Sequence, residues 1–264
     1  MRRFVLVLAI AGFEAVARAA QAEERAPAFA AAACEGIYPK HLQGICADGV
    51  GSVYWSFTDV LVKSDARGKV EKKIPVASHH GDLCYHDGKV LVAVNLGRFN
   101  DPQGNADSWV YVYNAADLSE LARHKIAEAV YGAGGIAARG GRFFVVGGLP
   151  PAVEENYVYE YDQTFRFVQR HVVRSGYTLM GIQTAAWADG YWWFGCYGDP
   201  KILLKTNAEF EMAGRYEFDC SLGVAGAARG RMLVGRGSCR PGIGCTGRIE
   251  AARPDDARGL VVVE

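Results

Sequence analysis

Polar side chains that could bind a ligand occur in three short segments that otherwise hold small and apolar residues. The segments contain His41 and Gln43, then His79, His80 and Asp82, and finally Gln183. Imidazole and carboxylate groups can exchange protons with a substrate near neutral pH, and imidazole is a common metal ligand. Alternate residues of a strand face the same side, so we expect His80 and Asp82 to share a face and His79 to point the other way. These residues form our candidate ligand-binding site, with hydrogen bonding between neighbouring strands as the structural alternative.

A long loop adds two further candidates, Asn95 and Arg98, to this set. Residues 95–109 are rich in amide and carboxylate oxygens, which are the ligands that calcium prefers. Their spacing is not that of an EF-hand, so a divalent metal such as calcium is a hypothesis and the cofactor stays unknown. Aromatic platforms for a sugar ring are also available, with packing between strands as their alternative role: Trp55, Trp109 and Tyr197.

The sequence lacks the common catalytic motifs. It holds no nucleophile elbow, phosphate-binding loop, dinucleotide fingerprint or zincin helix. Glycoside hydrolysis by two carboxylates needs a pair of acids about 5 to 9.5 Å apart. The acids that we consider for it are Asp82, Asp107, Glu154 and Glu155. The catalytic residues therefore stay unknown, and it stays open whether the protein is an enzyme.

The elements that would position these residues follow a repeat of five units. Each unit opens with a strand of small and apolar residues, turns at a glycine and continues into a strand rich in β-branched and aromatic residues. The turn glycines recur on average about every 45 residues, and they are Gly51, Gly88, Gly141, Gly190 and Gly230. Seven residues before the turn, Gln183 stands in the fourth unit and a glycine in the others: Gly44, Gly81, Gly134 and Gly223.

The third strand of most units ends in an Asp or Asn residue. These residues are Asp65, Asn114, Asp162 and Asn207. Such side chains cap turns by bonding to the nearby backbone, and a more polar fourth strand follows. We therefore predict an all-β fold, a five-bladed β-propeller of four-stranded antiparallel blades, with a β-sandwich as the alternative. Loops that enter the first strands and loops that follow the second strands then open on one face, where we expect the ligand site.

The N-terminus has the features of a secretory signal. A basic start, an apolar run and small-residue cleavage sequences predict a signal peptide over residues 1–22, with an ordinary helix as the alternative. We expect residues 23–33 to form a disordered lead-in and residues 34–264 to form a single β-propeller domain. No later stretch is long and apolar enough to insert into a membrane. We therefore expect an exported protein, periplasmic or extracellular.

Charge and cysteine content narrow the class of partner and the compartment. Removing the predicted signal from the charge-balanced sequence leaves a net charge of about −2, which argues against nucleic acid. We expect a monomer whose partner is a small molecule or a glycan.

The seven cysteines leave at least one thiol unpaired in a monomer. Cys239 and Cys245 bracket a turn-rich loop, and we predict a disulfide between them.

The repeat resembles that of secreted five-bladed β-propeller proteins. Residues 42–69 (LQGICADGVGSVYWSFTDVLVKSDARGK) are similar to the first blade of the propeller-type glutaminyl cyclases, which has a Gln-Gly in its inner strand, then a strand, an Asp and a Gly-Lys turn. The resemblance implies the propeller fold and a glutaminyl-cyclase-like acyltransferase activity. That family carries a Glu after the Tyr of its second strand, whereas Trp55 and Ser56 follow Tyr54 here.

Our leading hypothesis for the function is a small-molecule or glycan binding site at the mouth of the central channel, with hydrolysis as its enzymatic form. The first alternative is a non-catalytic scaffold for protein interactions, which predicts a large exposed apolar patch. The second alternative is the cyclase-like acyltransferase that the resemblance implies.

Overall fold

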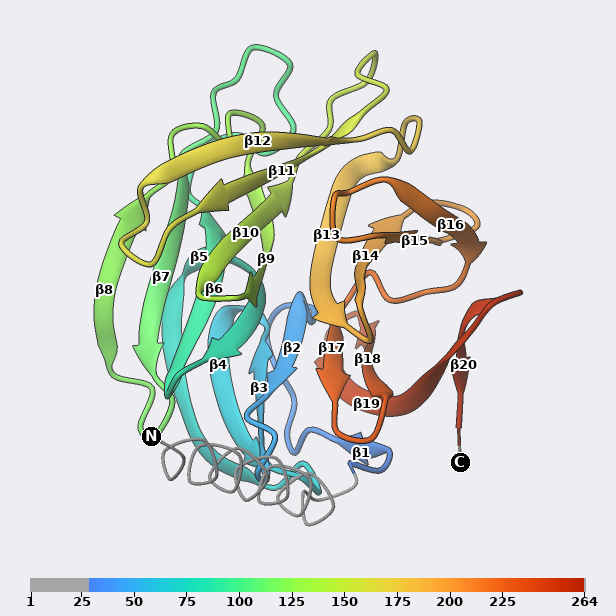
Figure 1. Ribbon diagram of the computed structural model, residues 1–264. Coiled ribbons are helices and arrows are strands. Elements are labelled where there is room, and N and C mark those ends of the chain that lie inside the picture. Colours follow the sequence, from blue (N-terminus) through green and yellow to red (C-terminus); the bar gives the residue numbers. More distant parts are fainter. Residues whose placement is uncertain (1–28, 264) are drawn as a thin grey trace, which may run out of the picture.

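All regular structure in the computed structural model, which describes residues 29–263, consists of β-strands. Within this described range, twenty strands form four antiparallel sheets (Figure 1). The predicted signal peptide lies outside the described residues. Within the described range, no helix is long and apolar enough to cross a membrane. The prediction of an all-β fold is confirmed.

The sheets follow one another along the chain. The largest contains β2 (Gly44–Ala47), β3 (Ser52–Ser56), β4 (Thr58–Asp65), β5 (Val70–His86), β6 (Lys89–Asn95), β7 (Ser108–Asn114) and β8 (Glu120–Lys125). The next contains β9 (Ala133–Arg139), β10 (Arg142–Gly147), β11 (Asn156–Tyr161) and β12 (Phe167–Val173). The third contains β13 (Leu179–Ala188), β14 (Tyr191–Tyr197), β15 (Ile202–Thr206) and β16 (Met212–Glu217). The last contains β17 (Val224–Ala227), β18 (Arg231–Arg240), β19 (Gly244–Asp255), β20 (Gly259–Val262) and β1 (Ala32–Ala33).

Strand β5 belongs to two groups of strands at once. Its first half pairs with β4 from Val70 opposite Ser64 to Pro75 opposite Val60, and again at His80 opposite Thr58 after a register shift. Its second half pairs with β6, from His80 opposite Val94 to the turn. The seven-stranded sheet is therefore two groups of four, β2–β5 and β5–β8, joined through one long strand.

The innermost strands of the groups form a closed ring. Strand β2 lies beside β5, β5 beside β9, β9 beside β13, β13 beside β17, and β17 beside β2. The strands approach so closely that several positions admit only glycine. A Cβ atom on Gly135 would lie 2.7 Å from the carbonyl oxygen of Gln183, and one on Gly44 would overlap the side chain of Asp82. Glycine at these positions lets the ring close.

The predicted glycine turns join the first strand of a group to its second strand, as Gly88 does between β5 and β6 and Gly190 between β13 and β14. Gly88 and Gly190 have φ angles of 73° and 76°, which side chains with a Cβ rarely adopt. The Asx residues also cap turns as predicted. Asp162 Oδ1 accepts hydrogen bonds from the backbone N–H groups of Thr164 and Arg166 at 2.8 and 3.1 Å. The corresponding residues Asp65, Asn114 and Asn207 make equivalent bonds.

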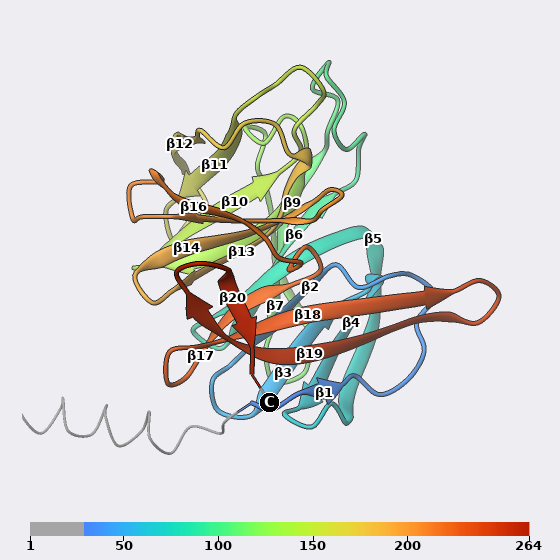
Figure 2. The same ribbon diagram turned by 90° about the vertical axis from the view of Figure 1, so that its right-hand side faces the viewer.

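Aromatic and aliphatic side chains fill the space between neighbouring groups. Phe144 of β10 lies against Trp192 of β14, with ring centroids 4.6 Å apart. Trp55 of β3 shares a core cluster with Leu233 of β18, which joins the first group to the last. The groups thus pack face to face around the ring (Figures 1 and 2).

Both ends of the described chain pair with the last sheet. Strand β1 pairs with β19 at Ala32 opposite Ile249, and β20 pairs with another part of β19 at Ala252 opposite Val262. Phe29 is buried in the adjoining core cluster. We expect a disordered lead-in as far as residue 33, but residues 29–33 are ordered, because β1 pairs with the edge of β19 and Phe29 packs in the core.

The predicted disulfide between Cys239 and Cys245 is present. The two cysteines face each other across the ladder of β18 and β19, near the turn that joins these strands. This hairpin projects beyond the neighbouring strands (Figure 2). The disulfide therefore links β18 and β19 near the tip of their long hairpin.

Replacing Phe29 by alanine tests whether the segment before β1 is part of the fold. Loss of this aromatic ring, which is 3% exposed, should lower the free energy of unfolding by about 3–5 kcal/mol. The matched change Phe167→Ala removes a ring that is 41% exposed and should cost roughly 0.5 kcal/mol or less. Urea unfolding measures both; equal small effects would show that Phe29 is not packed in the core.

Candidate functional site

A cavity of about 460 Å³ opens where the inner strands begin. Five of the eight candidate residues from the sequence line it: His41, Gln43, His79, Asn95 and Gln183. They come from the segment entering β2, from β5, from the end of β6 and from β13. The cavity thus lies on the face of the ring where the chain enters the first strand of each group and leaves the second strand.

Two histidine rings converge on one amide group at this cavity. The side-chain nitrogen of Gln43 lies 2.6 Å from Nε2 of His41 and 2.9 Å from Nε2 of His79. An amide NH₂ group has two hydrogens to donate and no lone pair to offer, so both ring nitrogens accept. Thr58 Oγ1 lies 3.4 Å from the same amide nitrogen and donates to the backbone oxygen of His41 at 3.1 Å. Gln43 therefore joins side chains from two strand groups.

Both histidines are held in the neutral form near pH 7. Partial burial and the positive charge of Lys40 lower the pKa of His41. Burial, then His41 and Lys40, lower the pKa of His79. Since an unperturbed histidine titrates near pH 6.5, these rings are neutral imidazoles at physiological pH.

The other two candidate amides differ in what they leave for a ligand. Gln183 donates from its side-chain nitrogen to the carbonyl oxygen of Met180 at 2.7 Å, which leaves its own carbonyl oxygen available. Asn95 is used by its own loop: its Oδ1 accepts from the backbone of Asp107 at 3.0 Å, and its Nδ2 donates to Gly97 at 3.0 Å. Gln183 is a ligand-contacting candidate, whereas Asn95 shapes the cavity wall.

His80 does not face the cavity. It is fully buried, with Nδ1 donating to the carbonyl oxygen of Ala77 at 2.6 Å and Nε2 accepting from the hydroxyl of Tyr113 at 2.8 Å. Burial lowers the pKa of His80 to about 4. The expected orientation of the histidine pair is wrong, because the pairing register shifts between His80 and Leu83 where β5 passes from β4 to β6.

Asp82 lies inside the ring rather than at its mouth. Its carboxylate accepts a hydrogen bond from the backbone N–H of Ala185 at 3.0 Å, which links β5 to β13. Burial raises the pKa of Asp82 well above its ordinary range, despite the opposing effect of that N–H group. Gly81 lines the large cavity and Leu83 lines a second one of about 160 Å³. Asp82 therefore separates the two cavities.

Arg98 is exposed and does not line the cavity, although its loop does. Several polar groups of this loop bond to one another. Asp101 accepts from the backbone of Gln103 at 3.0 Å and from Asn105 at 2.9 Å, and Asp107 accepts from the indole of Trp109 at 3.0 Å. These oxygens organise the loop, which does not favour the calcium hypothesis.

Four side chains of the cavity lie outside the set of eight candidates: Phe99, Ala133, Met180 and Tyr197. Tyr197 was considered only as an aromatic platform, and it does line the cavity. The other two aromatic platforms do not line the cavity. Trp55 is in the core, and the ring of Trp109 is covered by Lys125, whose Nζ lies 5.4 Å from the ring centroid. Phe99 lies in a loop and Met180 at a strand start, so neither has a periodic pattern that marks it.

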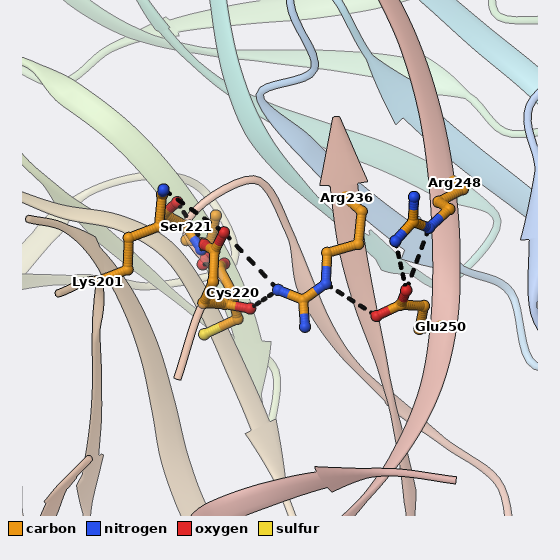
Figure 3. A network of polar contacts seen from close by, with 8 residues as sticks. Lys201, Cys220, Ser221, Arg236, Arg248 and Glu250 are labelled. Atoms are coloured by element: carbon orange, nitrogen blue, oxygen red, sulfur yellow. Dashed lines mark hydrogen bonds and ion pairs between the residues drawn. The ribbon is translucent and has the colours of Figure 1, made fainter. Parts of the chain in front are cut away.

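An ion-pair network fixes the chain segment between β16 and β17 (Figure 3). Arg236 of β18 donates to Glu250 at 2.9 Å and to the backbone oxygen of Asp219. Lys201 lies 3.7 Å from the carboxylate of Asp219. Burial, together with the charge of Asp219, raises the pKa of Tyr197. The phenol of Tyr197 is thus a protonated hydrogen-bond donor at neutral pH.

No known protein-family model and no curated protein matches this sequence. Solved structures do match. A Myxococcus xanthus glutaminyl cyclase superposes with a TM-score of 0.58 at 12% identity, over 89% of this chain and 100% of that chain. A xylan beta-1,4-xylosidase from Bacillus halodurans gives 0.60 at 13% identity, over 87% of this chain and 56% of that chain. The WD40 repeats of RRP9 give 0.52 at 11% identity, over 91% and 84%.

These likenesses show the fold alone. WD40 repeats form β-propellers, and the ring of inner strands with sheets packed around it is the same architecture. The chain therefore has a β-propeller fold with repeated, antiparallel sheets.

Alanine substitution separates the roles of the two adjacent histidines. His80→Ala leaves the buried hydroxyl of Tyr113 without its partner and should lower the free energy of unfolding by about 1–3 kcal/mol or more. His79→Ala changes an exposed ring and should cost roughly 0.5 kcal/mol. Thermal melts of both variants measure the difference; a larger loss for His79→Ala would contradict the described packing.

The low pKa of His80 predicts a pH dependence of stability. The folded state binds this proton only below about pH 4, whereas the unfolded chain binds it below about pH 6.5. The stabilisation is therefore complete above pH 6.5 and is lost as the pH falls toward 4, by about 3 kcal/mol. Urea unfolding at pH 7, 5.5 and 4 should show a steeper loss for the natural chain than for His80→Gln, which does not titrate. Parallel curves would refute the assignment.

Proposed function

We propose that this protein is an exported five-bladed β-propeller that binds an uncharged small molecule, with a glycan as the favoured class, in the cavity at the channel mouth. The blade count is supported by the division of β5 between two groups and by the closed ring of five inner strands. Export is supported by the disulfide at the β18–β19 turn, since such bonds persist in oxidising compartments.

The observation that carries the ligand class is the neutral polar lining of the cavity. Its polar groups are imidazoles, amides and a phenol, and none of the described residues around it is Asp, Glu, Lys or Arg. Phe99 and Tyr197 add aromatic surface, on which a sugar ring can pack. The volume of about 460 Å³ suits a ligand of one or two sugar rings.

The same lining favours binding over hydrolysis. Hydrolysis of a glycoside needs two carboxylates beside the bond that breaks, and the described lining residues include none. Asp82 is fully buried below the cavity. We therefore propose a binding protein and not a two-carboxylate glycosidase.

The two alternatives receive less support. For cyclase chemistry, the position after Tyr54 is held by Trp55, which is fully buried and donates to Ser64 at 2.9 Å. For a protein scaffold, the exposed large apolar side chains are spread over separate parts of the fold, for example Ile37 before β2, Leu121 on β8 and Phe167 on β12. The convergence of His41 and His79 at one cavity favours a small ligand.

A panel of neutral mono- and disaccharides, titrated by ligand-observed NMR, tests the proposal. At least one sugar should bind, and Gln183→Ala should weaken it by about tenfold because a hydrogen bond to the ligand is lost. The matched control Gln103→Ala changes an exposed loop side chain outside the cavity and should bind as the natural chain does. Binding of none of the sugars, or equal binding by both variants, would contradict the proposal.

A further inference from the structure

The two histidines of the cavity direct ring nitrogens toward a common point. Their Nε2 atoms both lie within 3 Å of the side-chain nitrogen of Gln43. The ring centroids are 6.2 Å apart, and the ring planes are inclined by 59°. We propose that His41 and His79, with Gln43 as a third ligand, bind a divalent transition-metal ion such as Zn(II) or Cu(II) at the rim of the cavity.

The donor atoms suit this class of ion. An Nε2 atom that accepts a hydrogen bond carries the same lone pair that would bind a metal, so no proton must leave either ring at neutral pH. Imidazole nitrogen suits Zn(II), Cu(II) and Ni(II), whereas Ca(II) requires oxygen ligands. The terminal amide torsion of Gln43 has a broad energy profile, and a half-turn brings its carbonyl oxygen to the side that now holds the nitrogen.

The surroundings keep this site accessible and partly ordered. His41 and His79 are exposed on the cavity side, so an ion can reach them from solvent. Gln43 is 6% exposed, and Thr58 contacts both its amide and the backbone of His41. Exposed rings can rotate toward an ion, while the buried stem of Gln43 keeps its place.

The site has only two strong protein ligands. Within residues 29–263 there is no cluster of three or more His, Cys, Asp or Glu side chains that could hold a metal. The remaining coordination positions would therefore face the cavity and take water or another small ligand, which is the open arrangement of a binding site rather than a closed structural one. This inference does not depend on glycan binding, because the ion alone can be titrated.

Calorimetric titration of the full chain, prepared without a histidine tag, with ZnCl₂ and separately with CuCl₂ tests the proposal. We expect one ion per chain, and a loss of affinity of about tenfold or more in His41→Ala and in His79→Ala. His86→Ala is the matched control, because this ring lies elsewhere, edge-on to Phe143 at 5.4 Å, and its loss should leave the affinity unchanged. Thermal melts in EDTA establish that each variant is folded.

A further variant tests Gln43 as the third ligand, because it should increase the affinity for the ion. Gln43→Glu replaces a weak amide donor with a carboxylate and should raise the affinity by about tenfold or more. The proposal is overturned if neither ion binds, or if binding survives both histidine changes. The role of Gln43 as a ligand is overturned if the Gln43→Glu variant binds the ion no more tightly than the natural chain does.

Discussion

The close approach of the inner strands is the constraint on which the rest of the structure depends. At Gly44, Gly134 and Gly135 a Cβ atom would meet a neighbouring strand at 3.3 Å or less, so the ring leaves almost no room for side chains. Asp82 is buried within the ring and hydrogen-bonded across it to the backbone of Ala185. Polar side chains at the beginnings of the inner strands therefore gather at the mouth. This is how His41 and His79, from two strand groups, reach the amide of Gln43.

Much of the fold could be predicted because its signals are local. A turn glycine such as Gly88 and an Asx cap such as Asp162 act through their own backbone, and both recur once per unit. The merging of two units through β5 could not be predicted, since nothing between Val70 and His86 marks where the strand changes partners. Pairing of β1 with β19 also escaped prediction, because Ala32 and Ala33 have no strand signal of their own and depend on a distant edge.

The candidate site could be predicted in part for a related reason. Polar residues such as Gln43 and Gln183 are conspicuous among small neighbours in the sequence. Because they lie near the beginnings of inner strands, they are expected at the mouth of the channel, where the cavity is. The orientation of His79 and His80 depends on a register shift in β5, which the alternation rule does not include. Phe99 reaches the cavity through the conformation of its loop, a long-range outcome that composition does not encode.

The amide of Gln43 joins two histidines, and the tautomers of the two rings test this arrangement most directly. Long-range ¹H–¹⁵N correlation NMR at pH 7 distinguishes protonated from unprotonated ring nitrogens. His41 and His79 should both be neutral, with Nε2 unprotonated and Nδ1 carrying the hydrogen. Protonated Nε2 atoms on both rings would contradict it, because the carbonyl oxygen of Gln43, and not its nitrogen, would then lie between them.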